Sequence, residues 1–406
     1  MDELATLSAM TNKMNMITSA ALFFLAAGIF TSVTILSAYQ ILFAIPLFYF
    51  TSIAFREKNY HLPKSAYWLV AFTIVALISS LINFELMPKP SKNLGKLKYF
   101  LFGVGGIFVL RYWTLNASDK MKRVILNTFF VSLIVAGAYV MYRYTTDVII
   151  SGVDRRGRPL TETMRYGYGS SMILLTLLSA ILHKERITNF FNHKLAIFAF
   201  VIGFLGMYLT YTRGALLGFL CGLPFVLFYY KKRLGLLVGG SAVILVGILG
   251  GIYLFGSGNY QSRFLMNKNN SSDVIRRSQW QAALIATKER PYLGWGLSNF
   301  HTQLKRIKIE NDLAAKDYND AHAHNLFLEV ASGTGLIGLF FFLGWVLSWA
   351  LELFFSGGLN RALIIPFGVA FVISSQFEVT FDANNACMIF FLYSLSSARF
   401  YQASLN

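Results

Sequence analysis

Long apolar runs separated by short polar turns dominate the sequence. Most runs reach the roughly 18 to 20 residues that an α-helix needs to cross about 30 Å of hydrocarbon, and they lack the alternation of barrel strands. The pattern predicts an all-α polytopic membrane protein, with residues 1–406 forming a single membrane domain. About twelve spans are expected, at residues 16–33, 36–55, 66–84, 99–113, 124–142, 167–182, 195–211, 214–230, 234–255, 326–350, 361–376 and 384–400.

Composition supports the same class. The hydrophobic share is 55%, the charged share 14% and the mean hydropathy +0.53, which is too much apolar surface for a soluble core of this length. The first apolar run is followed at once by another, so we expect an uncleaved first span rather than a signal peptide. No nucleotide-binding glycine loop is recognisable, and Cys221 and Cys387 lack the close spacing of a metal or redox pair.

Basic residues predict the orientation of the chain. With the amino terminus in the cytoplasm, alternate short loops carry lysine and arginine, as in Lys231-Lys232-Arg233, and both termini are cytoplasmic. The loop after the fifth run and the long segment at 256–325 break this rule, because both are rich in arginine on the opposite side. A guanidinium binds phosphate in two places, so arginines retained there suggest a phosphate or diphosphate substrate. The arginines that we single out in these two segments are Arg155, Arg156, Arg158, Arg276 and Arg277.

Arg213 interrupts two apolar runs that have almost no loop between them. A charge held near the membrane boundary is a functional hypothesis by default, and the alternative is a side chain that snorkels to the interface. Gly214 would let a neighbouring backbone or ligand come close, or would simply begin the next helix.

The segment at 256–325 is too long for an idle connector. Its residues 273–288 predict an amphipathic helix that Pro291 ends, followed by a turn that enters another helix. Trp280 and Trp295 are interpreted as anchors at the membrane interface.

The stretch Asp320-Ala321-His322-Ala323-His324-Asn325 precedes the tenth run. A histidine there can take a proton from an attacking hydroxyl, or can cap the span. A zinc site is not expected, because two residues of spacing on a helix point His322 and His324 apart and no further ligand lies at ligand spacing nearby. Asn325 is a candidate cap of the next helix.

Together these residues resemble the O-antigen ligase superfamily. The resemblance runs from the seventh to the tenth apolar run, whereas the first half of the chain is similar only in its pattern of spans. Its pieces are, in chain order, Thr212-Arg213-Gly214, Arg276 four residues before Trp280, Arg290-Pro291-Tyr292-Leu293-Gly294-Trp295-Gly296-Leu297-Ser298-Asn299-Phe300, and His324-Asn325-Leu326-Phe327-Leu328-Glu329 running into Gly333-Thr334-Gly335-Leu336-Ile337-Gly338.

The resemblance implies a metal-independent, inverting glycosyltransferase of the GT-C class in the Gram-negative inner membrane, without a cofactor. It would move an O-antigen glycan from undecaprenyl diphosphate to a sugar hydroxyl of the lipid A core on the periplasmic face. Arg213 and Arg276 would bind the donor diphosphate, and His324 would act on the acceptor hydroxyl. His324 is preferred to His322 because Asn325 and the leucine pattern follow it. Arg276 is preferred to Arg277 for its spacing to Trp280. Arg277, His322, Asn325, Arg155, Arg156 and Arg158 are expected to contact substrate.

Three alternatives stay open. A Wzy-type polymerase would join two carrier-linked glycans, and an O-linked oligosaccharyltransferase would use a protein hydroxyl. Relatives of the latter kind carry a longer carboxy-terminal region, so the short end of this sequence favours the ligase. A transporter predicts paired repeats, and no convincing internal repeat is visible.

Overall fold

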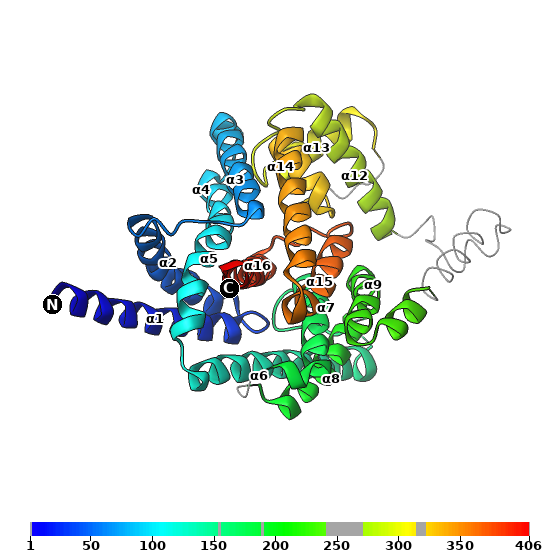
Figure 1. Ribbon diagram of the computed structural model, residues 1–406. Coiled ribbons are helices and arrows are strands. Elements are labelled where there is room, and N and C mark those ends of the chain that lie inside the picture. The colour runs from blue at the N-terminus through cyan, green and yellow to red at the C-terminus, as the bar shows by residue number, and fades with distance from the viewer. Residues whose placement is uncertain (1, 153–155, 188–190, 241–270, 314–321, 406) are drawn as a thin grey trace.

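The computed structural model describes residues 2–152, 156–187, 191–240, 271–313 and 322–405, and these form helices and no strand (Figure 1). The all-α prediction is therefore confirmed for the described part of the chain. The helices of the first half are α1 (Asp2–Gly28), α2 (Val33–Arg56), α3 (Lys64–Ile82), η1 (Phe84–Leu86), α4 (Pro90–Leu94), α5 (Leu97–Asn116), α6 (Asp119–Arg143), η2 (Tyr144–Ile150), α7 (Thr163–Leu182) and η3 (Lys184–Arg186). Those of the second half are α8 (His193–Leu209), α9 (Arg213–Tyr230), α12 (Ser271–Glu289), α13 (Phe300–Glu310), α14 (Leu326–Ser356), α15 (Gly358–Ser374) and α16 (Ala383–Leu405).

Among the described residues, six helical stretches are long and apolar enough to cross a membrane, and α8 and α15 are shorter apolar helices. These apolar helices make the chain a multi-pass membrane protein. The count of twelve spans and the GT-C class stay predictions, and most of the predicted run at 234–255 lies outside the described residues. The six stretches are Val33–Arg56, Lys64–Ile82, Pro90–Asn116, Asp119–Ile150, Arg213–Tyr230 and Leu326–Ser356.

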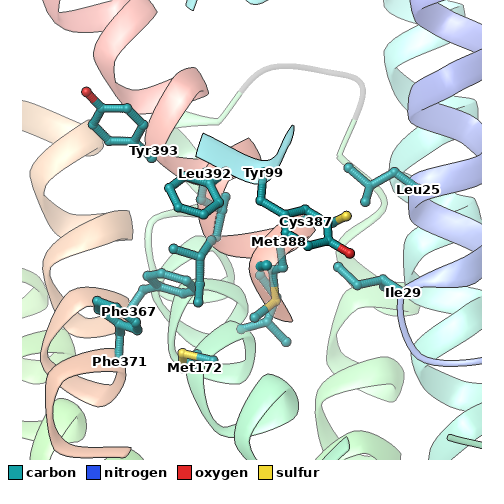
Figure 2. Close-up of a cluster of buried hydrophobic side chains, with 14 of the residues drawn as sticks. Leu25, Ile29, Tyr99, Met172, Phe367, Phe371, Cys387, Met388, Leu392 and Tyr393 are labelled. Atoms are coloured by element: carbon teal, nitrogen blue, oxygen red, sulfur yellow. The ribbon is translucent and has the colours of Figure 1, made fainter. Parts of the chain in front are cut away.

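The carboxy-terminal helix α16 forms the middle of the packing, since it contacts α2, α5, α7, α14 and α15 (Figure 1). Figure 2 shows Leu25 of α1, Tyr99 of α5, Met172 of α7 and Phe367 of α15 gathered around the start of α16. Cys387 of α16 is 2% exposed within this core, as expected of a plain buried thiol. Burial of large apolar and aromatic side chains thus fixes where the loop that precedes α16 can lie.

Two glycine-rich segments far apart in sequence clamp together at a kink in α14. Gly335 breaks the helix with φ 71°, and a Cβ on it would lie 2.1 Å from the Tyr292 carbonyl oxygen. Three backbone hydrogen bonds join the two segments. They run from Trp295 N to Ser332 O (2.9 Å), from Gly296 N to Gly333 O (2.7 Å) and from Leu336 N to Pro291 O (2.7 Å). We call residues 290–296 and 332–336 the glycine clamp. Only residues without a Cβ allow the backbones to approach this closely.

The helices α12 and α13 pack on α14 and share a small core of their own (Figure 1). The predicted amphipathic helix is confirmed as α12, with Ala283 and Ala286 in this core, whereas Leu284 is 51% exposed. The interpretation of Trp295 as an interface anchor is wrong. Its ring is 9% exposed, and its Nε1 donates to the Ala286 carbonyl oxygen at 3.0 Å. The residues of this core are Ala282, Ala283, Ala286, Trp295, Phe300, Leu304, Ile307 and Ala323.

Candidate functional site

The two histidines of the predicted motif converge on one buried carboxylate. His322 Nε2 lies 2.5 Å from Glu378 Oε1, and His324 Nδ1 lies 2.9 Å from Glu378 Oε2 and 3.1 Å from Oε1. Glu378 is 6% exposed at its side chain, His324 18% and His322 34%. The cluster is therefore closed on the carboxylate side and open on the histidine side, where a substrate can approach.

The segment that carries the histidines is not helical. The prediction that a helix would point the two rings apart is therefore wrong. In a non-helical backbone, residues two apart can lie on the same side. Ala323, between them, is fully buried in the core of α12 and α13, so both histidines face the other way. His324 itself has φ 47°, and its carbonyl oxygen accepts from Trp280 Nε1 at 3.4 Å. This packing holds a strained backbone that presents both rings to one acceptor.

Glu378 lies on the loop between α15 and α16, and that loop is tied to the start of α14. Leu326 N donates to the Ser375 carbonyl oxygen at 2.8 Å, and Asn325 Nδ2 donates to the Gln376 carbonyl oxygen at 3.2 Å. Asn325 Oδ1 also accepts from Leu328 N at 3.1 Å, which confirms Asn325 as the cap of α14. The sequence interpretation missed Glu378. An acidic residue between two apolar runs was the signal that could have found it.

The hydrogen bonds determine the charge of the cluster. Burial by itself would raise the pKa of Glu378, but the hydrogen bonds from His322 and His324 outweigh it and hold that pKa well below its usual range. Burial also lowers the pKa of His322, yet the hydrogen bond and charge of Glu378 overcome it and raise the pKa above the ordinary 6.5. Glu378 is thus ionised, and His322 keeps its proton to a higher pH than an ordinary histidine does.

His324 turns its Nδ1 toward the carboxylate, so a neutral His324 carries its proton on that nitrogen. Its Nε2 then has the lone pair that a base needs. An imidazole oriented by a carboxylate in this way is the usual arrangement of a general base.

The same three side chains can be considered as metal ligands, because their donor atoms lie within 4.8 Å of one another. The premise that no third ligand accompanies the histidines is therefore wrong, since folding supplies Glu378. The spacing nevertheless fits hydrogen bonds. A tetrahedral metal with bonds of roughly 2.0 to 2.2 Å would hold its ligand atoms roughly 3.3 to 3.5 Å apart. The 2.5 and 2.9 Å contacts here are shorter.

The turn that carries Arg213 lies against the same loop. Helix α8 ends at Leu209 and α9 begins at Arg213, as the interrupted apolar pattern predicts. A Cβ on Gly214 would lie 2.9 Å from Phe377 Cβ, one residue before Glu378. The neighbours at Gly214 are thus side chains, and the approach of a backbone or a ligand there stays a prediction. Arg213 is exposed beside this contact.

Arg276 lies on α12 one turn before Trp280, whose indole bonds the His324 carbonyl oxygen. Arg276 is half-buried, whereas Arg277 is exposed. The partial burial of Arg276 agrees with its choice over Arg277. Arg276 also lies on the helix whose Trp280 supports the histidine segment.

The loop that contains Arg156 and Arg158 is attached to the end of α8 by a hydrogen bond from Gly157 N to the Leu209 carbonyl oxygen at 2.9 Å. Both arginines are exposed, each next to Gly157 in sequence, and Leu209 ends the helix that precedes the Arg213 turn. Arg155 lies outside the described residues, and a contact of any of the three with substrate stays a prediction.

A family model matches residues 198–343, a segment that contains Arg213, Arg276 and His324. That model describes the O-antigen ligase family. The resemblance of this segment to O-antigen ligases is thus confirmed, over little more than a third of the chain. The matched segment includes both halves of the glycine clamp but not Glu378, which the fold adds from outside it.

A relative of this chain is an uncharacterized protein of Haemophilus influenzae, 27% identical over 267 residues. The similar region covers 59% of this chain and 65% of that protein, so the chain spans less than two thirds of the relative's length.

Proposed function

We propose that this protein is an O-antigen ligase. It transfers an O-antigen glycan from undecaprenyl diphosphate to a sugar hydroxyl of the lipid A core, on the periplasmic face of the bacterial inner membrane. The observation that carries the proposal is the histidine pair on Glu378, which lies in one site with the Arg213 turn and with α12, the helix of Arg276. The family match supports the same class of chemistry.

In the proposed reaction, the acceptor hydroxyl oxygen attacks the anomeric carbon of the donor sugar from the face opposite the diphosphate. The new carbon–oxygen bond forms while the bond to the diphosphate oxygen breaks, and its electron pair leaves with the diphosphate. The hydroxyl proton passes to Nε2 of His324. The sugar–phosphate bond supplies the driving force, so no nucleotide or metal takes part.

Arg213 and Arg276 would stabilise the negative charge that develops on the leaving diphosphate, because a guanidinium donates two parallel hydrogen bonds to phosphate oxygens. Glu378 would orient His324 through Nδ1 and stabilise the imidazolium that forms. His322 and Asn325 would hold Glu378 and the start of α14 in place. Arg155, Arg156, Arg158 and Arg277 are proposed contacts to acceptor or donor phosphates.

The test is transfer by the purified full-length protein, with a defined undecaprenyl-diphosphate glycan as donor and lipid A core as acceptor. The expected product is core extended by the glycan, with release of undecaprenyl diphosphate. Extension of one carrier-linked glycan by another, with no product on lipid A core, would make the protein a polymerase instead. Transfer only to a protein hydroxyl would make it an oligosaccharyltransferase.

A further inference from the structure

Helix α7 contributes a tyrosine whose hydroxyl group is buried and has no hydrogen-bond partner in the described part of the chain. Tyr168 is 1% exposed, and among the residues that the structure describes none bonds its phenolic oxygen. A buried tyrosine hydroxyl group usually forms a hydrogen bond, because an unpaired one loses the free energy of its hydration without replacement. Since no residue in the described part of the chain bonds this oxygen, its position points to a partner in the substrate.

The hydroxyl group lies at the junction of the elements that form the proposed site. A Cβ on Gly214 would lie 2.5 Å from the Tyr168 oxygen and 2.9 Å from Phe377 Cβ. Gly214 follows Arg213, and Phe377 precedes Glu378. The charges of Glu378 and Arg276 also act on this hydroxyl group. Tyr168 is thus placed where the Arg213 turn meets the loop that carries Glu378.

Close packing on either side of Tyr168 fixes the direction of its ring. A Cβ on Gly167 would lie 2.8 Å from Thr212 Oγ1, and one on Gly169 would lie 2.4 Å from Asn385 Oδ1. Both glycines let α7 press against the Arg213 turn and the start of α16. Rotation of α7 about its axis would create clashes at these contacts, so Tyr168 is held facing Gly214.

Glu378 does not satisfy the hydroxyl group, because its oxygens already accept from His322, His324 and Val379 N (3.0 Å). The Tyr168 hydroxyl group can donate a hydrogen bond to an anionic oxygen that the arginines also bind. Hydrogen bonds to ionised acceptors are stronger than those between neutral groups.

We propose that the Tyr168 hydroxyl group binds substrate, by donating a hydrogen bond to a phosphate oxygen of the lipid-linked diphosphate donor beside Arg213 and Arg276. This inference rests on the proposed function, and it assigns a third donor to the diphosphate from a helix that belongs to neither arginine.

The test compares Tyr168→Phe with Tyr166→Phe in the purified full-length protein. Tyr166 is also 1% exposed on α7, but its hydroxyl group donates to the Gly203 carbonyl oxygen of α8 at 3.4 Å, away from the Gly214 turn. Binding of farnesyl diphosphate and of farnesol is measured for each variant, together with KM for the glycan donor. Tyr168→Phe is expected to weaken farnesyl diphosphate binding by about ten- to hundredfold, the loss of one hydrogen bond to a charged oxygen. Farnesol binding should stay unchanged, and Tyr166→Phe should bind both ligands as the wild type does.

Equal binding of farnesyl diphosphate by Tyr168→Phe and wild type would overturn the inference. An equal loss of farnesol binding by Tyr168→Phe would also overturn it, as would an equal loss of farnesyl diphosphate binding by Tyr166→Phe. Either of these losses would indicate an effect on helix packing. If Tyr168→Phe does not accumulate, Gly214→Ala is tested in its place, because the alanine methyl group would displace the Tyr168 hydroxyl group. The same selective loss of farnesyl diphosphate binding is expected. A wild type that binds farnesyl diphosphate but transfers nothing to lipid A core would refute the ligase function and leave the Tyr168 contact to be judged by binding. A wild type that does not bind the diphosphate refutes both.

Discussion

The imidazole rings of His322 and His324 lie with their centroids 4.4 Å apart, inclined by 39°, and both bond the same carboxylate. The two rings are not equivalent, because His322 bonds through Nε2 and His324 through Nδ1. Only His324 keeps its Nε2 for a substrate. The first prediction follows from this difference.

His324→Ala is expected to lower kcat for glycan transfer by about 10² to 10⁴, the usual contribution of a general base. His322→Ala should lower kcat by about tenfold, because His322 uses its Nε2 on Glu378 and so acts through that carboxylate. Initial rates with saturating donor and acceptor measure both. A larger loss for His322→Ala would reverse the assignment of the base.

Arg213→Ala and Arg276→Ala are each expected to lower kcat by about 10² to 10³, as removal of one donor to a developing anion does. Lysine at either position should restore only part of the rate, since it cannot form the paired hydrogen bonds. Arg277→Ala is the comparison on the same helix, because the exposed Arg277 is proposed only as an outlying phosphate contact, whereas Arg276 is half-buried and is proposed at the leaving diphosphate. The loss for Arg277→Ala should stay below about tenfold, and a loss as large as that of Arg276→Ala would contradict the choice between them.

Glu378→Gln should lower stability in a pH-dependent way. The lowered pKa of Glu378 gives stability that is present above its ordinary 4.5 and lost as pH falls toward the lowered value. The raised pKa of His322 gives stability that is present below 6.5 and lost as pH rises through the raised value. The difference in Tm between wild type and Glu378→Gln is therefore expected to be largest between about pH 4.5 and 6.5.

Thermal unfolding of the detergent-solubilised protein across pH measures this difference. Glu310→Gln serves as the control, because Glu310 pairs with Arg306 at the surface and not with a histidine. A Tm difference for Glu378→Gln that is the same at pH 5.5 and pH 9 would show that the charged pair does not contribute.

Gly335→Ala is expected to disrupt the glycine clamp. Its new Cβ would lie 2.1 Å from the Tyr292 carbonyl oxygen, at a φ of 71° that disfavours any side chain. Backbone strain of this kind costs about 1 to 3 kcal/mol, so a lower Tm or poor accumulation in the membrane should follow. Gly368→Ala in α15 is the control, because none of the residues that the structure describes lies within 4 Å of its Cβ position. It should be neutral or slightly stabilising, and a similar effect of both changes would remove the clamp from the explanation.

Transfer activity is expected to survive exhaustive chelation, because the Glu378 contacts have hydrogen-bond lengths. The measurement is the transfer rate before and after chelation with EDTA followed by dialysis into metal-free buffer. Loss of activity with recovery on added Zn²⁺ would instead make His322, His324 and Glu378 a metal site.

Several parts of this protein could be predicted from local sequence. Apolar run length placed the helices, the interruption at Arg213 separated α8 from α9, and a side-chain cap at Asn325 began α14. The amphipathic pattern of α12 was equally local. Each of these features depends on residues within a few helical turns of one another. The local sequence pattern is therefore enough to predict them.

The chemistry of the site depends on residues that are far apart in the sequence, so no local sequence pattern predicts their contact. Glu378 reaches His324 from 54 residues away, because α14, α15 and α16 pack around a common core and bring the loop before α16 to the start of α14. The helical assumption for the histidine segment failed, because burial of Ala323 in the core of α12 and α13 determines which way the rings face.

The sequence by itself determined an all-helical membrane chain, the identity of its arginine and histidine candidates, and a resemblance that the family match confirmed. Hydropathy and motif order are properties of neighbouring residues, which is why they sufficed. Only the tertiary structure decided that Glu378 joins the histidines and that Tyr168 faces Gly214, because both depend on how glycines and alanines let separate helices approach.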